Sequence, residues 1–172
     1  SPNTTPTRTR TAIPKPLLPV GEKSILEIQV LRLKEHGVEE IFVATNYKSD
    51  YIESFMGDGS RFGLKLHISR EEKPLGTCGP LTLIREQLDE RFFVMNGDIL
   101  TTIDFTTLGA FSNRTGADLS VVTKEMWLPY AFGKVDSEGD FLTGVEEKPN
   151  VRMEIIAGIY VITQGAFDFI QK

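Results

Sequence analysis

Phe92-Phe93-Val94-Met95-Asn96-Gly97-Asp98-Ile99-Leu100 opens as a continuous apolar run of strand length and then stops at Asn-Gly-Asp. A buried parallel strand has this pattern, because helices cover both of its faces and no alternation with polar residues is needed. The polar residues then fall at the carboxyl end of the strand, where open α/β sheets bind ligands. Asp98 is therefore a candidate ligand for Mg²⁺ beside a phosphate group. On the local pattern alone, a simple turn explains Asn96-Gly97-Asp98 equally well.

Composition narrows the class of protein. The 172 residues are enough for one domain, and 40% apolar with 25% charged residues is ordinary for a globular protein with a core. The net charge of −5 argues against general binding to nucleic acid or to an anionic membrane. The single cysteine excludes an internal disulfide, and no Cys/His metal spacing occurs. Without a signal peptide or an apolar run long enough to span a bilayer, we expect a cytoplasmic protein.

The first dozen residues differ from the rest of the chain. Residues 1–12 are rich in Thr, Arg and Pro, so we expect an irregular, mobile segment before a domain over residues 13–172. Pro14-Lys15-Pro16 follows, and its prolines impose an extended path on a stiff backbone. Lys15 is a candidate anion-binding residue, and the alternative is a solvated lysine in a loop.

Helical and strand patterns alternate along the first two thirds of the chain. Ser24 and Glu27 form a capping-box pattern at the start of a helix that reaches His36. Further helices are expected at 50–55, 81–88 and 105–114, and strands at 40–45, 64–68, 119–123 and 155–162. A hairpin with strands at 130–135 and 142–145 follows the alternating part. This order predicts an α/β fold with a mixed, mainly parallel sheet sandwiched by helices.

Two loops and one strand carry further candidate residues. Gly76 and Gly79 flank small residues directly before a helix, where exposed backbone N–H groups and the helix dipole favour an anion. Glu146-Glu147-Lys148-Pro149 holds two acids and a base against a proline, although by itself it is typical of a solvated charged loop. Gly158 interrupts an apolar strand, as a glycine does where a ligand or another backbone approaches closely.

Five motifs, taken in order, resemble the sugar-phosphate nucleotidyltransferase family. They are Pro-Lys-Pro-Leu-Leu-Pro-Val-Gly, Pro-Leu-Gly-Thr-x-Gly, Asn-Gly-Asp, Glu-Lys-Pro and Ala-Gly-Ile-Tyr, and the resemblance runs from about Ile13 to the end of the chain. It implies a Rossmann-like sheet with a β-hairpin insertion near the sugar site, and Mg²⁺ as cofactor. The implied partners are a nucleoside triphosphate and a sugar 1-phosphate, and the implied products are a nucleotide sugar and pyrophosphate.

The resemblance also assigns roles on the nucleotide side. Lys15 matches the lysine that contacts the phosphates and steadies the transition state, and Asp98 matches the metal aspartate. The residues implied to hold the nucleotide are Glu72, Leu75, Gly76, Thr77 and Asn96. The loop around Gly76 is similar to that of mannose-1-phosphate guanylyltransferases and of nucleotidyltransferases with CBS domains, which leans towards GTP.

Four more positions match the sugar side of the family. Gly133 matches a glycine that lets the sugar approach the backbone, and Glu147 matches an acceptor for a sugar hydroxyl. Lys148 matches the lysine that binds the sugar 1-phosphate, and Gly158 lies in the strand that closes the sugar pocket. In-line attack by the sugar phosphate needs positioning and charge neutralisation rather than a general base, so a site without histidine is suited to it.

The chain departs from the family pattern at both ends. The family has an apolar strand and a Gly-x-Gly-Thr-Arg-Leu loop before Pro-Lys-Pro, whereas residues 2–11 contain no glycine and no apolar run. Arg8 and Arg10 lie nearby but do not match the motif. Ile156 stands at the position of the usual Asn, and a second metal aspartate is not reached. The missing strand should leave a gap in the sheet.

Several interpretations of these departures remain open. The chain is incomplete at both ends, or it is a degenerate relative that binds a sugar phosphate or nucleotide sugar without catalysis, or another chain supplies the missing strand. A homo-oligomer is compatible with the sequence. A glycosyltransferase on a similar sheet ranks last, because Asn96-Gly97-Asp98 has only one acid of the paired Asp-x-Asp motif.

Overall fold

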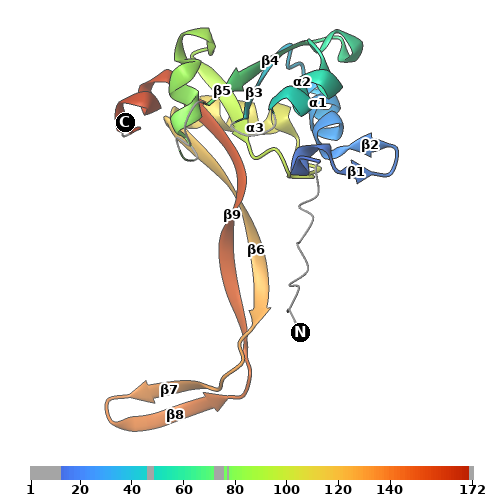
Figure 1. Cartoon of the computed structure of the whole chain (residues 1–172). Coiled ribbons are helices and arrows are strands. Elements are labelled where there is room, and N and C mark those ends of the chain that lie inside the picture. The colour runs from blue at the N-terminus through green and yellow to red at the C-terminus, as the bar shows by residue number, and fades with distance from the viewer. Residues whose placement is uncertain (1–12, 46–48, 72–75, 77, 171–172) are drawn as a thin grey trace, which may run out of the picture.

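The computed structural model describes residues 13–45, 49–71, 76 and 78–170, so the segment 1–12 that we expect to be mobile lies outside the described residues. Figure 1 shows a body of short strands and helices from which two long strands project as an arm. A second hairpin turns away at the far end of the arm. None of the described helices has the length and apolar character needed to cross a membrane.

The amino-terminal half of the body is built on a parallel strand pair. Strand β3 (Glu40–Thr45) pairs with β4 (Lys65–Arg70) in the parallel direction, in register from Glu40 with Lys65 to Thr45 with Arg70. Helices α1 (Ile25–Glu35) and α2 (Ser49–Met56) pack on one face of this pair. The shared core consists of Leu26, Val30, Ile52, Met56, Phe62, Leu64 and Leu66.

Helix α1 begins where the sequence predicts. The Ser24 side chain accepts a hydrogen bond from the Glu27 N–H at 3.2 Å, and the Glu27 carboxylate accepts one from the Ser24 N–H at 2.8 Å. This reciprocal pair confirms the capping box and satisfies two backbone donors at the helix start. Before it lie a 3-10 turn, η1 (Lys15–Leu17), and a small antiparallel ribbon of β1 (Pro19–Val20) and β2 (Lys23–Ser24).

The second half of the body is a three-stranded sheet in the order β5-β9-β6. Strand β5 (Arg91–Met95) pairs with β9 (Asn150–Thr163), which also pairs with β6 (Leu119–Pro129). Both pairings are antiparallel, so the expectation that the central apolar run has parallel hydrogen-bonded neighbours is wrong. The residues of β5 are only half-buried, because β5 has a strand partner on one side alone within the described part of the chain.

Helical segments cover both faces of this sheet, as the α/β class requires. Helix α3 (Phe105–Thr115) is capped by Asp104 and contributes Phe105 to a cluster with Leu33 of α1 and Ile159 of β9. The helix expected at 81–88 is instead two 3-10 segments, η3 (Gly79–Leu83) and η4 (Arg85–Gln87), which meet at Ile84 where φ is −120°. Leu81 of η3 and Phe167 of η5 (Gln164–Phe169) pack on the opposite face of the sheet.

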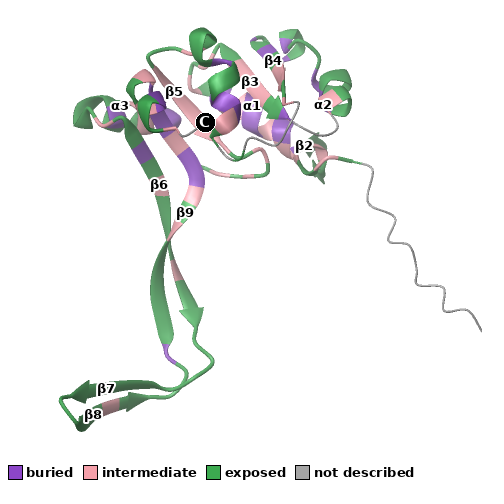
Figure 2. Cartoon of the chain, turned by 60° about the vertical axis from the view of Figure 1, so that its left-hand side comes forward, coloured by how far each residue is buried: buried purple, intermediate pink, exposed green. Residues whose placement is uncertain are grey.

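The arm is longer than the sequence pattern predicts. The strand expected at 119–123 runs on to Pro129, and β9 begins at Asn150, so the two strands continue as a paired ribbon beyond the body. At its far end, β7 (Lys134–Glu138) and β8 (Phe141–Glu146) form a hairpin. Its second strand lies where it was predicted, whereas its first strand begins at Lys134 rather than at Tyr130. Figure 2 shows that most residues of the arm and hairpin are exposed, in contrast to the body. A further 3-10 turn, η2 (Ser60–Phe62), precedes β4 in the body.

Candidate functional site

The carboxyl end of β5 brings two of the predicted motifs together. The loop Asn96-Gly97-Asp98 directly follows β5, and a Cβ added at Gly97 would lie 3.2 Å from Cγ of Pro16. That contact is tighter than most Cβ contacts, so a glycine lets Pro16 pack closely on the loop. It places the turn that carries Lys15 against the loop that carries Asp98. Both side chains are exposed.

A third motif meets the same loop from β9. Gly158 has a φ of +75°, and a Cβ there would lie 2.6 Å from Nδ2 of Asn96 and 2.7 Å from Cδ1 of Ile99. The Asn96 N–H donates to the Gly158 carbonyl at 3.0 Å. The glycine in the apolar strand therefore marks a close approach, as the sequence predicts, but the group that approaches in this structure is Asn96.

A buried glutamine holds this loop on the body. Gln29 of α1 is 6% exposed, and its amide nitrogen donates to the carbonyls of Asn96 at 3.0 Å and Ile99 at 2.7 Å. One turn further along α1, Arg32 donates to the Ile103 carbonyl at 3.1 Å. The sequence analysis missed Gln29. The available signal was a polar residue between Ile28 and Val30 of the helix, where the neighbouring apolar residues face the core.

Three of the four predicted sugar-side residues, Gly133, Glu147 and Lys148, form a separate group at the far end of the arm, whereas Gly158 lies at the body. A Cβ added at Gly133 would lie 3.4 Å from Oε2 of Glu147, so these two positions are in contact range. Lys148 follows with a φ of +47°, which is an uncommon conformation for a residue with a side chain. The Tyr130 N–H donates to the Pro149 carbonyl at 2.9 Å and closes the end of the ribbon.

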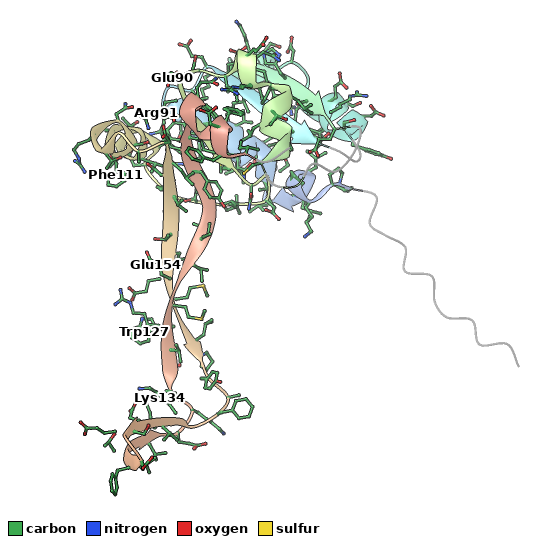
Figure 3. All side chains as sticks on the ribbon, turned by 90° about the vertical axis from the view of Figure 1, so that its left-hand side faces the viewer. Glu90, Arg91, Phe111, Trp127, Lys134 and Glu154 are labelled. Atoms are coloured by element: carbon green, nitrogen blue, oxygen red, sulfur yellow. The ribbon has the colours of Figure 1, made fainter. Side chains whose placement is uncertain are left out.

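The two groups do not meet in this structure. Lys134, which begins the distal hairpin one residue after Gly133, is labelled at the foot of the arm in Figure 3, well away from Arg91 at the start of β5. The geometry therefore joins Lys15, Asn96, Asp98 and Gly158 at the body, and joins Gly133 with Glu147 at the arm. It does not bring Lys148 to Asp98.

The nucleotide loop is described only in part. Glu72, Leu75 and Thr77 lie outside the described residues. Gly76 is exposed with a φ of +79°, and a Cβ there would meet no atom of the described residues within 4 Å. Open space beside its backbone is compatible with the close approach of a flat base, and the left-handed backbone favours glycine.

The donor set at Asp98 suits a cation that is shared with a substrate. No cluster of three or more His, Cys, Asp or Glu side chains that could hold a metal occurs among the described residues. Mg²⁺ is commonly bound by one or two carboxylates together with substrate phosphates and waters, so a single exposed carboxylate fits it only when phosphates supply further oxygens. Asp98 would hold the ion, and the ion would neutralise phosphate charge when bound.

The distal hairpin carries a lysine that stays charged. Asp136 lies 2.9 Å from Nζ of Lys134, and this hydrogen-bonded carboxylate raises the pKa of Lys134 above its ordinary value. The carboxylate of Glu146 acts in the same direction. Lys134 is therefore charged at neutral pH, and the paired carboxylate of Asp136 balances its charge.

Comparisons with known proteins agree with the motifs. The family model described as "Nucleotidyl transferase" matches residues 9–172. The chain is 34% identical over 169 residues to "Probable mannose-1-phosphate guanylyltransferase 1" of Oryza sativa subsp. japonica, covering 93% of this chain and 47% of the relative. It is 33% identical over 178 residues to "UTP--glucose-1-phosphate uridylyltransferase" of Synechocystis sp., covering 92% and 46%. The chain thus spans about half the length of the curated relatives it matches.

Solved structures have the same fold. HddC from Yersinia pseudotuberculosis superposes with a TM-score of 0.73 at 24% identity, over 96% of this chain and 74% of that one. A putative glucose-1-phosphate thymidylyltransferase from Bacillus anthracis superposes with a TM-score of 0.63 over 90% of this chain. The Rossmann-like α/β class is confirmed by these superpositions. The chain therefore belongs to the nucleotidyl transferase family, in agreement with the resemblance of its motifs to the sugar-phosphate nucleotidyltransferases.

Proposed function

We propose that this chain carries the catalytic centre of an enzyme that transfers a nucleotidyl group from a nucleoside triphosphate to a sugar 1-phosphate. The proposal rests on two contacts at the carboxyl end of β5. Pro16 packs on Gly97, and Gly158 packs against Asn96. Three motifs that are distant in the sequence are in contact there, and Lys15 and Asp98 are both exposed at this edge of the sheet. That edge is where α/β sheets bind ligands.

In this proposal, Lys15 would contact the phosphates of the triphosphate, and Asp98 would hold a Mg²⁺ ion, which would supply further charge neutralisation when bound. A phosphate oxygen of the sugar 1-phosphate attacks the α-phosphorus, and the bond from that phosphorus to the bridging oxygen of pyrophosphate breaks. No proton has to be removed from the attacking group, because a sugar phosphate is already an anion. Positioning and charge neutralisation supply the rate enhancement.

The sugar phosphate is assigned to the arm. Lys148 would bind the phosphate and Glu147 a sugar hydroxyl, with Gly133 leaving room beside the backbone. This assignment requires the arm to approach the body when both substrates are bound, since the two groups lie apart in the free chain. A two-strand ribbon with one bulge between Val121 and Thr123 is a suitable element to bend.

Guanosine triphosphate is the nucleotide we propose first, because several of the relatives are named as guanylyltransferases of mannose 1-phosphate. The relative from Synechocystis sp. is named as a uridylyltransferase, so the base requires a direct test. Pyrophosphate release should be measured with Mg²⁺ for each nucleoside triphosphate against a panel of sugar 1-phosphates, with mass spectrometry of the products. The proposal expects one nucleotide sugar per pyrophosphate, and hydrolysis of added nucleotide sugar without pyrophosphate formation would contradict it.

Binding without transfer is the second candidate. It is favoured by residues 2–11, which contain no glycine where the family has its glycine loop, and by the separation of Lys134 at the foot of the arm from Arg91 in the body. Lys148→Met, with Lys124→Met on the same arm as matched control, separates the cases. Both candidates expect Lys148→Met alone to weaken sugar 1-phosphate binding by about tenfold or more, the loss of one charge-assisted contact. Only the first candidate also expects a fall in pyrophosphate release.

A further inference from the structure

Strand β4 has one free edge. Among the described residues it pairs only with β3, in the parallel direction. Figures 1 and 2 show β3 between β4 and β5, so the free edge of β4 faces away from β5 and from the rest of the sheet. A free edge exposes backbone donors and acceptors, and proteins use such edges to bind extended peptides.

The backbone alternation shows which residues of β4 face this free edge. The Lys65 N–H donates to the Glu39 carbonyl at 2.8 Å, and the Glu71 N–H donates to the Thr45 carbonyl at 2.9 Å. The odd residues of β4 therefore direct their backbone groups to β3, and the even residues direct theirs to the free edge.

Two of the even residues have unused backbone donors. The Leu66 N–H donates to the Asp58 carbonyl at 2.8 Å, which covers the start of the edge. Within the part of the chain that the structure describes, the N–H groups of Ile68 and Arg70 have no comparable backbone partner. These two residues can therefore accept an added strand.

A groove of about 730 Å³ runs along the same edge. The consecutive residues 66–70 of β4 all line it. Leu66 and Ile68 pack in the core cluster beneath α1 and α2, so their side chains lie on one face of the sheet, whereas His67 points to the other face. One cavity that touches both faces passes around the free edge, because β3 covers the other edge.

The wall of the groove on the α2 side is acidic. It carries the carboxylates of Glu53 and Asp58. Hydrogen bonds from the side chain and backbone of Ser60 lower the pKa of Asp58, so this carboxylate is ionised at neutral pH. Arg70 lines the groove and pairs with Glu53 and, at 2.9 Å, with Asp50. Three carboxylates thus surround one guanidinium, which favours a basic partner.

The opposite wall carries the apolar groups of the groove. Leu83 of η3, which is 50% exposed, lines it together with Ile84. Phe42 of β3 lines the same side, and its ring stacks on that of His67 with the ring centroids 4.8 Å apart. Gln87 of η4 adds a polar group. An added strand directs alternate side chains to the two faces of a sheet, so this groove suits a segment in which basic and apolar residues alternate.

We propose that this groove binds an extended segment of another protein, in which basic and apolar residues alternate, by strand addition to the free edge of β4. About five residues of the segment would pair with the edge, which is an ordinary strand length. Its backbone would bond to Ile68 and Arg70, its basic side chains would lie beside Glu53 and Asp58, and its apolar side chains would pack on Leu83. The inference stands independently of the proposed nucleotidyl transfer.

The test uses an acetylated and amidated peptide of about seven residues, in which lysine alternates with valine and leucine. Calorimetry measures binding, and NMR measures amide hydrogen exchange on the whole chain. Saturable binding should slow exchange by about tenfold or more at Ile68 and Arg70. Exchange at His67 and Ser69 should not change, because their N–H groups already face β3.

Two chemically modified peptides test strand addition on the unchanged chain. Only alternate N–H groups of an added strand face its neighbour. Methylation of the lysine nitrogens of the peptide backbone, or of the valine and leucine nitrogens, should therefore abolish binding in one case and not in the other. A peptide with glutamate in place of each lysine should not bind, because the α2 wall is acidic.

Two matched pairs of variants place the site. Leu83→Asn should weaken peptide binding by about fivefold or more, whereas Leu119→Asn, at a leucine of similar exposure on β6, should not. Asp58→Asn keeps an acceptor for the Ser60 N–H and removes the charge. It should weaken binding by about twofold or more and reduce its salt dependence, whereas Asp140→Asn in the distal hairpin should do neither.

Four results would overturn the proposal. They are no saturable binding up to about 1 mM, equal binding of both methylated peptides, equal binding of the glutamate peptide, and equal losses in the matched control variants. Slow exchange at Ile68 and Arg70 before any peptide is added would also overturn it, because a second copy or another segment of the same protein would then occupy the edge. If a variant fails to fold, the modified peptides on the unchanged chain decide.

Discussion

Replacing Gln29 by leucine tests whether α1 holds the Asp98 loop. The amide of Gln29 donates to the Asn96 carbonyl at 3.0 Å and to the Ile99 carbonyl at 2.7 Å, and the side chain is buried. Leucine has a similar size and is apolar, so Gln29→Leu removes both hydrogen bonds and leaves the helix and its packing in place. The loop then loses its only described side-chain anchors to α1 within residues 96–100.

The expected cost follows from two lost hydrogen bonds. A typical intramolecular hydrogen bond contributes about 1 kcal/mol net, and a carbonyl left without a partner costs more when water cannot reach it. Asn96 and Asp98 are exposed, so water can replace part of the interaction. We therefore expect the free energy of unfolding to fall by about 2 kcal/mol, which lowers the Tm of a chain of this size by about 4–8 °C.

Urea unfolding followed by circular dichroism measures the stability, and amide exchange by NMR measures the loop. Gln87→Leu is the matched control, because Gln87 is exposed and the same substitution there should change stability by less than about 0.5 kcal/mol. Exchange at residues 97–100 should accelerate in Gln29→Leu and not in the control. A loss of stability equal to that of the control, with unchanged exchange in the loop, would refute the assignment of Gln29 as a positioning residue.

Three further substitutions test the local structure. Gly158→Ala should cost about 1–3 kcal/mol in urea unfolding, since its Cβ would lie 2.6 Å from Nδ2 of Asn96 at a φ of +75°, and a normal midpoint would contradict the close approach. Ser24→Ala should cost about 1 kcal/mol by removing the cap of α1, and an unchanged thermal midpoint would show that the cap is dispensable. The hydrogen bond from the Thr107 N–H lowers the pKa of Asp104. The ionised Asp104 therefore stabilises the fold above the usual carboxyl pKa, and this stabilisation is lost as the pH falls through the lowered pKa. Asp104→Asn should therefore make urea midpoints less dependent on pH below about 4, and identical profiles for the two proteins would be the contrary result.

Local signals were sufficient for most of the body. The capping box located the start of α1, and the strand at Glu40–Thr45 has the bounds that its apolar run predicts. The Asn-Gly-Asp motif was placed correctly at a strand end, and the glycine in β9 correctly marked a close approach. These features depend on a few neighbouring residues, so the sequence contains the information that decides them.

Features that depend on distant partners were less predictable. The apolar run 92–95 was expected between parallel strands, but its hydrogen-bonded neighbour β9 comes from residues more than 60 positions later and runs antiparallel. An apolar run without alternation indicates that a strand is buried on both faces, but it does not indicate whether the neighbouring strand is parallel or antiparallel. Similarly, the helix expected at 81–88 is divided at Ile84, where φ is −120°, into two 3-10 segments, although its periodicity is helical.

The position of the motif at the end of the arm could not be predicted from the motif itself. Glu147 and Lys148 were matched to sugar-binding positions of the family, and the long pairing of β6 with β9 carries them to the far end of the ribbon. One side of that ribbon bears Met126, Leu128, Val151 and Met153, which pair across the strands without cover from the body. Nothing in the local sequence of the turn indicates how far it lies from β5, because that distance is set by strand length and pairing.

The rate of pyrophosphate release by the unchanged chain and by Asp98→Asn, with Mg²⁺, GTP and mannose 1-phosphate at equal concentrations, tests the central claim most directly. Asparagine keeps the size of the side chain and removes the charge that would hold the ion, so both proteins should have the same urea midpoint. The account predicts release by the unchanged chain and a rate lower by at least about tenfold in Asp98→Asn, or about 1.4 kcal/mol in activation free energy. Equal rates for the two proteins, or no release by a folded, unchanged chain with any nucleotide and sugar 1-phosphate pair, would contradict it.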